Sequence, residues 1–162
     1  MMKAAGRPAA APAVDIRIES ELWQAQPQAE STIRAAIAAA ASFSDPGGEV
    51  SVLLTDDAEI ARLNRDWRHL DKPTNVLSFP APAQGAGNLL GDIVLAYETV
   101  ARECDAEDRQ FLHHLAHLAA HGFLHLIGYD HQTDSQAEEM EGLESRIMLR
   151  LNMPDPYRAH ER

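Results

Sequence analysis

The spacing of apolar residues divides the chain into short strands and amphipathic helices. Val14, Ile16 and Ile18 alternate with charged residues, a period of two that predicts a half-buried strand. Ile33 and Ile37 lie four residues apart in an alanine-rich stretch, which indicates a helix from about 28 to 43. The same criteria predict strands over 49–55, 75–79 and 89–96, helices over 56–66 and 135–151, and a long helical stretch that is interrupted near 104–106 and reaches about 127.

The order of these elements is one hairpin-like strand pair among helices, with the late helices together. That order predicts the α+β class, with a small mixed β-sheet flanked by helices. A length of 162 residues suits a single domain. We place this domain at residues 14–157, between a flexible N-terminal tail (1–13) and a short C-terminal tail (158–162). Residues 80–88, which hold two prolines and two glycines, are expected to form a loop.

Composition indicates which cellular compartment and which partners to expect. Cys104 is the single cysteine, so no intrachain disulfide can form and a reducing compartment is favoured. The N-terminal tail lacks the apolar centre of a signal peptide, and no apolar run approaches the roughly 18–20 residues that cross a bilayer. We therefore expect a cytoplasmic protein without a membrane partner.

Charge limits how nucleic acid could be bound. The net charge of −11 argues against a broad nucleic-acid footprint, and no DNA partner is expected. A local basic cluster remains, made of Arg62, Arg65, Arg68 and Lys72. The acidic run from Asp134 to Glu144 is explained by a helix with a solvated polar face.

Three histidines near residue 125 carry the candidate chemistry. His121 and His125 are four residues apart, so on a helix they share one face with Cβ atoms about 5–6 Å apart. Gly128 lets the chain turn at the helix end and brings back His131 as a third ligand. Three neutral nitrogens without a fourth protein ligand leave one coordination position for water, the pattern of a catalytic zinc site.

Other polar residues flank this helix-turn motif. His113, His114 and His117 lie too far toward the helix N-terminus to reach the same ion, at about 1.5 Å of rise per residue. His117 could hydrogen-bond behind the ligands or simply pack. Asp130 could orient a ring or a bound water, or cap the turn.

The histidine spacing is also that of the metzincin proteases, His-Glu-x-x-His-x-x-Gly-x-x-His. Gly122 stands where those enzymes carry the glutamate that acts as general base, so peptide hydrolysis by that mechanism is disfavoured. A metal can acidify water to a pKa near 7, and the resulting nucleophile can attack a phosphodiester when charge on phosphorus is stabilised. Arginine can stabilise that charge because its planar fork matches phosphate oxygens, and Arg68 in the basic stretch is a candidate for this role.

The segment from His121 to His131 resembles the signature of the YbeY family of bacterial endoribonucleases, the ribosomal RNA maturation factors. Arg68 together with 72–80 is similar to the other hallmark of that family. Residues 90–94 resemble its central strand, and 138–144 with 154–157 resemble its C-terminal helix and tail. The likeness covers roughly residues 49–157, and the combination of motifs is highly specific.

The resemblance implies a zinc site formed by His121, His125 and His131, although nitrogen ligands also suit another transition metal such as nickel. It implies that His121 and Arg68 are catalytic, with Arg68 contacting phosphate. The activity implied is single-strand-specific RNA cleavage in 16S rRNA 3′-end maturation and ribosome quality control, with the small ribosomal subunit as partner. Two alternatives stay open: a non-catalytic ribosome-assembly factor whose zinc stabilises the fold and, with less support, a metalloprotease.

Overall fold

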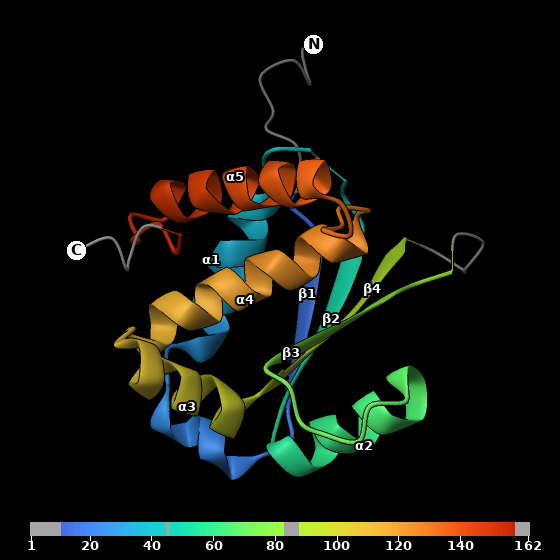
Figure 1. Cartoon of the computed structure of the whole chain (residues 1–162), viewed down its shortest axis with the longest axis vertical. Helices are drawn as coiled ribbons and strands as arrows, with labels where there is room; N and C mark the ends of the chain where they lie inside the picture. The colour runs from blue at the N-terminus through green and yellow to red at the C-terminus, as the bar shows by residue number, and fades with distance from the viewer. Residues whose placement is uncertain (1–10, 45, 83–87, 158–162) are drawn as a thin grey trace.

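Four strands form one mixed sheet in the order β1-β2-β4-β3 (Figure 1). The computed structural model describes residues 11–44, 46–82 and 88–157. β1 is parallel to β2 and β2 to β4, whereas β3 and β4 pair antiparallel as the expected hairpin-like unit. The strand bounds are β1 Ala13–Ile18, β2 Glu49–Thr55, β3 Val76–Pro80 and β4 Leu89–Ala96. The α+β class with a small mixed sheet is therefore confirmed.

Helices cover the two faces of this sheet unequally (Figure 1). The helix α4 contacts β3 and β4 and also packs against α1, α3 and α5, so it is the centre of the main layer. α2 packs on the opposite face, against β4. The bounds are α1 Ala29–Ala41, α2 Asp57–Arg68, α3 Tyr97–Glu107, α4 Phe111–Leu126 and α5 Asp134–Arg150.

Alternate residues of β4 serve two separate cores. Ile93 and Leu95 enter the main core beneath α1 and α4. Val94 and Ala96 point to a smaller core, where they meet Ile60 of α2. Because both faces of the strand are covered, β4 reads as a nearly continuous apolar run rather than as an alternation.

A short 3-10 helix, η1 (Glu21–Ala25), follows β1 at a place where periodicity predicts no element. Its Trp23 is only 2% exposed, and the indole nitrogen donates to the carbonyl of Thr55 at 2.9 Å. The indole ring also packs edge-on against Tyr97 and Phe111. Trp23 is the one buried residue of η1, and a single buried side chain has no period, so its burial could not be read from spacing.

The interruption between α3 and α4 lies later than predicted. Cys104 is buried in the main core, and α3 continues past it to Glu107. Asp108 then adopts a left-handed conformation with φ 53°, which aspartate tolerates, and α4 begins at Phe111. The predicted break near 104–106 is therefore wrong by a few residues.

The ends of the chain and one loop are only partly described. β1 begins at Ala13, one residue earlier than predicted. Residues 1–10 of the expected N-terminal tail, the expected C-terminal tail 158–162 and residues 83–87 of the expected loop lie outside the described residues. Among residues 11–44, 46–82 and 88–157, no helix has the length and apolar character needed to span a bilayer.

A glycine turn connects α4 to α5, as the sequence predicts. Gly128 has φ 107°, a conformation that side-chain-bearing residues rarely adopt. Five residues later, Thr133 starts α5 with a capping box: its side chain accepts from the Gln136 backbone, and the Gln136 side chain accepts from the Thr133 backbone. The segment between these two residues carries His131.

We predict opposite effects of alanine at two glycines that both have open space around an added Cβ. Gly128→Ala should lower the free energy of unfolding by about 1–2 kcal/mol, because only its backbone conformation is strained. Gly142→Ala, on the exposed side of α5, should raise it by about 0.5–1 kcal/mol, because glycine weakens a helix. Urea unfolding measures both values, and a stabilising Gly128→Ala would contradict the turn described here.

Candidate metal centre

Three imidazoles converge at the C-terminal end of α4. His121 and His125 stand one turn apart on the helix, and the glycine turn brings back His131. The Nε2 atoms of His121 and His125 are 3.2 Å apart, and one ring nitrogen from each of the three residues lies within 4.8 Å of the others. Zinc–nitrogen bonds of about 2.0–2.1 Å in tetrahedral geometry place two ligand nitrogens about 3.3 Å apart. The group therefore has the donor atoms and spacing to hold a metal ion.

The surroundings of His125 favour its neutral form, which is the form that metal ligation requires. Burial lowers the pKa of His125, and the neighbouring charges of His121 and His131 lower this pKa further. A neutral ring keeps a lone pair available, whereas a protonated ring has none. His131 is exposed, so the three-histidine group opens toward solvent.

The three histidines share a cavity of about 570 Å³ with Arg68. Arg68 ends α2 and reaches the cavity from the opposite layer of the fold. Its Nη2 donates to the carbonyl of Ser78 at 2.5 Å, and its guanidinium carbon lies 5.4 Å from the centre of the Phe79 ring. The arginine predicted from the sequence is thus held by β3 at the wall of the histidine cavity.

The other arginines of the expected basic cluster are paired with carboxylates. Arg62 contacts Glu59 at 2.6 Å and Asp66 at 3.2 Å. Arg65 contacts Asp66 at 3.4 Å. These pairs reduce the local positive charge, so the basic cluster is less positive than its arginine and lysine content suggests.

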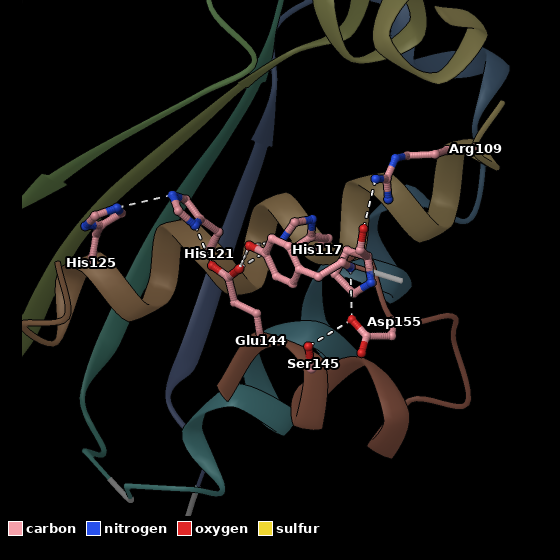
Figure 2. A network of polar contacts seen from close by, with 9 residues as sticks. Arg109, His117, His121, His125, Glu144, Ser145 and Asp155 are labelled. Atoms are coloured by element: carbon pink, nitrogen blue, oxygen red, sulfur yellow. Dashed lines mark hydrogen bonds and ion pairs between the residues drawn. The ribbon is translucent and has the colours of Figure 1, made fainter. Parts of the chain in front are cut away.

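Glu144 links α5 to the candidate ligands (Figure 2). Its Oε2 lies 2.5 Å from Nδ1 of His121, and its Oε1 lies 3.1 Å from Nε2 of His117. The hydroxyl of Tyr157 donates to the same Oε1. Glu144 is only 1% exposed, so its assignment to a solvated acidic face was wrong.

A sequence signal for this burial did exist. Met140, Leu143, Ile147 and Met148 form the buried stripe of α5, with spacings of three and four residues. Glu144 falls inside that stripe, whereas the acidic residues around it are exposed. An acid within an apolar stripe needs a partner, and the histidines of α4 are that partner.

Hydrogen bonds keep the Glu144 carboxylate ionised. Burial alone would raise its pKa, but the hydrogen bonds from His117 and His121 outweigh burial and lower the pKa to about 2. An ionised acceptor holds the proton of His121 on Nδ1, which leaves the Nε2 lone pair facing His125. The carboxylate thus sets both the tautomer and the orientation of one candidate ligand.

The remaining candidates behind the ligands also have defined contacts. His117 hydrogen-bonds Glu144, so of the two alternatives it makes a polar contact behind the ligands and does not simply pack. Asp130 accepts from the backbone nitrogen of His131 at 2.8 Å, so it fixes the turn. His114 is buried and lies 2.8 Å from Glu103 of α3, away from the three-histidine group.

Gly122 is the close contact between α4 and the sheet. A Cβ at this position would lie 3.0 Å from Oγ of Ser78 and 3.2 Å from Cγ2 of Ile93. The Ser78 hydroxyl donates to the Gly122 carbonyl at 3.0 Å. A side chain at 122 would therefore press on Ser78 and Ile93, which disfavours the protease glutamate at that position.

We predict that Glu144→Gln weakens zinc binding about 10- to 100-fold, the usual effect of removing a carboxylate that orients a ligating histidine. Competition against a chromophoric chelator measures the affinity. Glu138→Gln, an exposed position on the same helix, is the matched control and should bind as the wild type does. Equal affinity of Glu144→Gln and wild type would contradict the orienting role.

The same carboxylate predicts how stability depends on pH. The pKa of Glu144 falls from 4.5 to about 2 in the folded chain. Its stabilising contribution is therefore complete above about pH 4.5 and is lost as the pH falls toward about 2. Between pH 5 and pH 3, the free energy of unfolding should drop more steeply for the metal-free wild type than for metal-free Glu144→Gln. Parallel curves would contradict this assignment.

Comparison with known proteins gives one consistent result. The profile of the family described as Endoribonuclease YbeY matches residues 15–152. A protein named Endoribonuclease YbeY from Bradyrhizobium sp. (strain BTAi1) is 53% identical over 161 residues, covering 93% of this chain and 95% of the relative. One of the same name from Rhodopseudomonas palustris (strain BisA53) is 52% identical over 160 residues, covering 93% of each chain. A third, from Bradyrhizobium diazoefficiens, is 53% identical and covers 90% of this chain and 85% of its own.

Proposed function

This chain belongs to the family of the endoribonuclease YbeY, and we propose that it cleaves single-stranded RNA by metal-dependent hydrolysis in the maturation of the 16S rRNA 3′ end. The observation that carries the proposal is the single cavity that joins the three-histidine group to Arg68. A metal-ligand set supplies Lewis acidity and a phosphate-binding side chain stabilises developing charge, and metal-dependent hydrolysis of a phosphodiester uses both.

We assign the metal to His121, His125 and His131. Three nitrogen donors suit zinc and also suit another transition metal such as nickel. When bound, the ion supplies Lewis acidity that lowers the pKa of water. Glu144 keeps the His121 proton on Nδ1, and Asp130 holds the backbone at His131, so the protein fixes two ligands before any ion arrives.

Arg68 is the group we assign to the phosphate of the RNA. A guanidinium presents a planar fork of donors that matches phosphate oxygens. The Ser78 carbonyl and the Phe79 ring hold this fork in place, which reduces the entropy that binding would otherwise cost. Charge that develops on the phosphate would then meet a donor already in position.

Charge further suggests where the protein acts. The net charge of −11 and the paired arginines of α2 give little long-range attraction for RNA. We infer that the small ribosomal subunit supplies part of the affinity by presenting the rRNA end, in the cytoplasm and in connection with ribosome quality control. A metalloprotease is the weaker alternative, since the position of its base is occupied by Gly122 against the sheet.

Removing the metal or one ligand should abolish cleavage. We expect His125→Ala, or treatment of the wild type with EDTA, to stop cleavage of a single-stranded RNA, and added Zn²⁺ to restore only the EDTA-treated wild type. His113→Ala, about two helical turns before the centre on the same helix, is the matched control and should stay active. Undiminished cleavage by EDTA-treated His125→Ala, purified identically, would exclude the proposed enzyme and point to a contaminating nuclease.

The variant Arg68→Ala should distinguish a loss of catalysis from a loss of metal binding. Arg68→Ala should lower cleavage about 100- to 1,000-fold, as loss of one transition-state donor does elsewhere, while zinc affinity stays unchanged. In cells that depend on this chain, the folded variant should leave unprocessed 16S 3′ ends. Normal maturation with Arg68→Ala would instead favour the non-catalytic assembly factor.

A further inference from the structure

The segment that follows α5 returns one side chain to the metal centre. α5 ends at Arg150, and Asn152 has φ 60°, which redirects the chain. Five residues later, the hydroxyl of Tyr157 donates to Oε1 of Glu144, on the oxygen that His117 also contacts. The Tyr157 ring stands edge-on to the His117 ring, with 5.6 Å between their centres.

We propose that Tyr157 is a positioning residue of the metal centre: through Glu144, its hydroxyl holds His121 in the tautomer and orientation that bind metal. Segment 152–157 is then part of the metal centre. This inference deepens the proposed function and rests on its three-histidine metal site.

Hydrogen bonds anchor segment 152–157 to α5 and to the residues before α4. Oδ1 of Asp155 accepts from the Ser145 hydroxyl at 2.8 Å and from the backbone nitrogen of Tyr157 at 2.9 Å (Figure 2). Arg109, which precedes α4, donates to the carbonyl of Pro156 at 3.0 Å. Pro156 is buried and its ring restricts the backbone. The tyrosine therefore arrives from a backbone tied both to α5 and to the start of α4.

The hydrogen-bond pattern explains how Tyr157 acts at a distance. A carboxylate can rotate about its last bond, because that torsion is broad. With Tyr157 and His117 on Oε1, the other oxygen is directed at Nδ1 of His121. Removing the phenol hydroxyl leaves a buried charge with one donor fewer, so the carboxylate gains freedom to turn and holds His121 less firmly.

The decisive variant keeps the tyrosine ring and removes only its hydroxyl. Tyr157→Phe should weaken Zn²⁺ binding about 3- to 10-fold, less than loss of the carboxylate itself, because Tyr157 acts one contact further away. The readout is competition against a chromophoric chelator with the full-length chain. Tyr97→Phe removes the same atom from a ring packed on Trp23 and Phe111, and it should bind Zn²⁺ as the wild type does.

A double-mutant cycle tests whether the effect passes through Glu144. Tyr157→Phe should cost nothing further in a Glu144→Gln background, since the intermediary is already lost. Nitrogen-15 spectra of the metal-free protein give a second readout. His121 should be the Nδ1–H tautomer in the wild type, and Tyr157→Phe should show a mixture.

The outcomes separate this inference from the function on which it rests. Wild-type affinity and an unchanged His121 tautomer in Tyr157→Phe would overturn it. An equal loss in both Glu144 backgrounds would also overturn it, because Tyr157 would then act independently of Glu144. Failure of the wild type itself to bind either Zn²⁺ or Ni²⁺ would remove the metal centre and, with it, both proposals.

Discussion

An ionised carboxylate with almost no exposed surface is the constraint around which the functional half of this molecule is arranged. Burying an unpaired carboxylate costs several kcal/mol, on the order of the whole stability of a small domain, so Glu144 must be surrounded by donors. Those donors come from His117 and His121 of α4 and from the segment after α5. The carboxylate thus joins three parts of the chain, and the geometry of the candidate ligands follows from that junction.

The different faces of α4 have different surroundings. α4 packs so closely on the sheet that a Cβ at residue 122 would press on Ser78 and Ile93, while its polar face carries histidines into an open cavity. Apolar residues on its remaining surface pack against α1, α3 and α5. Because the helix is held from several sides, His121 and His125 are positioned by the core and not by flexible loops. This is the rigidity that a site built to bind an ion requires.

Much of this arrangement could be predicted from the sequence, for identifiable physical reasons. Strands such as 49–55 and the spacing of His121, His125 and His131 are local patterns, so periodicity and spacing reveal them. Trp23 lies in a segment too short to have a period, and its partners are distant in the chain. Glu144 was misassigned because its neighbours are acidic and exposed, although its position in the apolar stripe of α5 signalled burial. The pairs of Arg62 with Glu59 and Asp66, by contrast, follow the three- and four-residue spacing of α2 and are themselves a local signal.

The two sides of the cavity rest on different cores. The histidines belong to the main layer, whereas Arg68 ends a helix that packs through Ile60, Leu63 and their neighbours on the reverse side of the sheet. Ser78 of β3 joins the two sides, because its carbonyl accepts from Arg68 and its hydroxyl donates to the carbonyl of Gly122 in α4. The width of the opening between the guanidinium and the imidazoles therefore depends on how β3 is held between the two cores, and a change in the packing of either core would alter it.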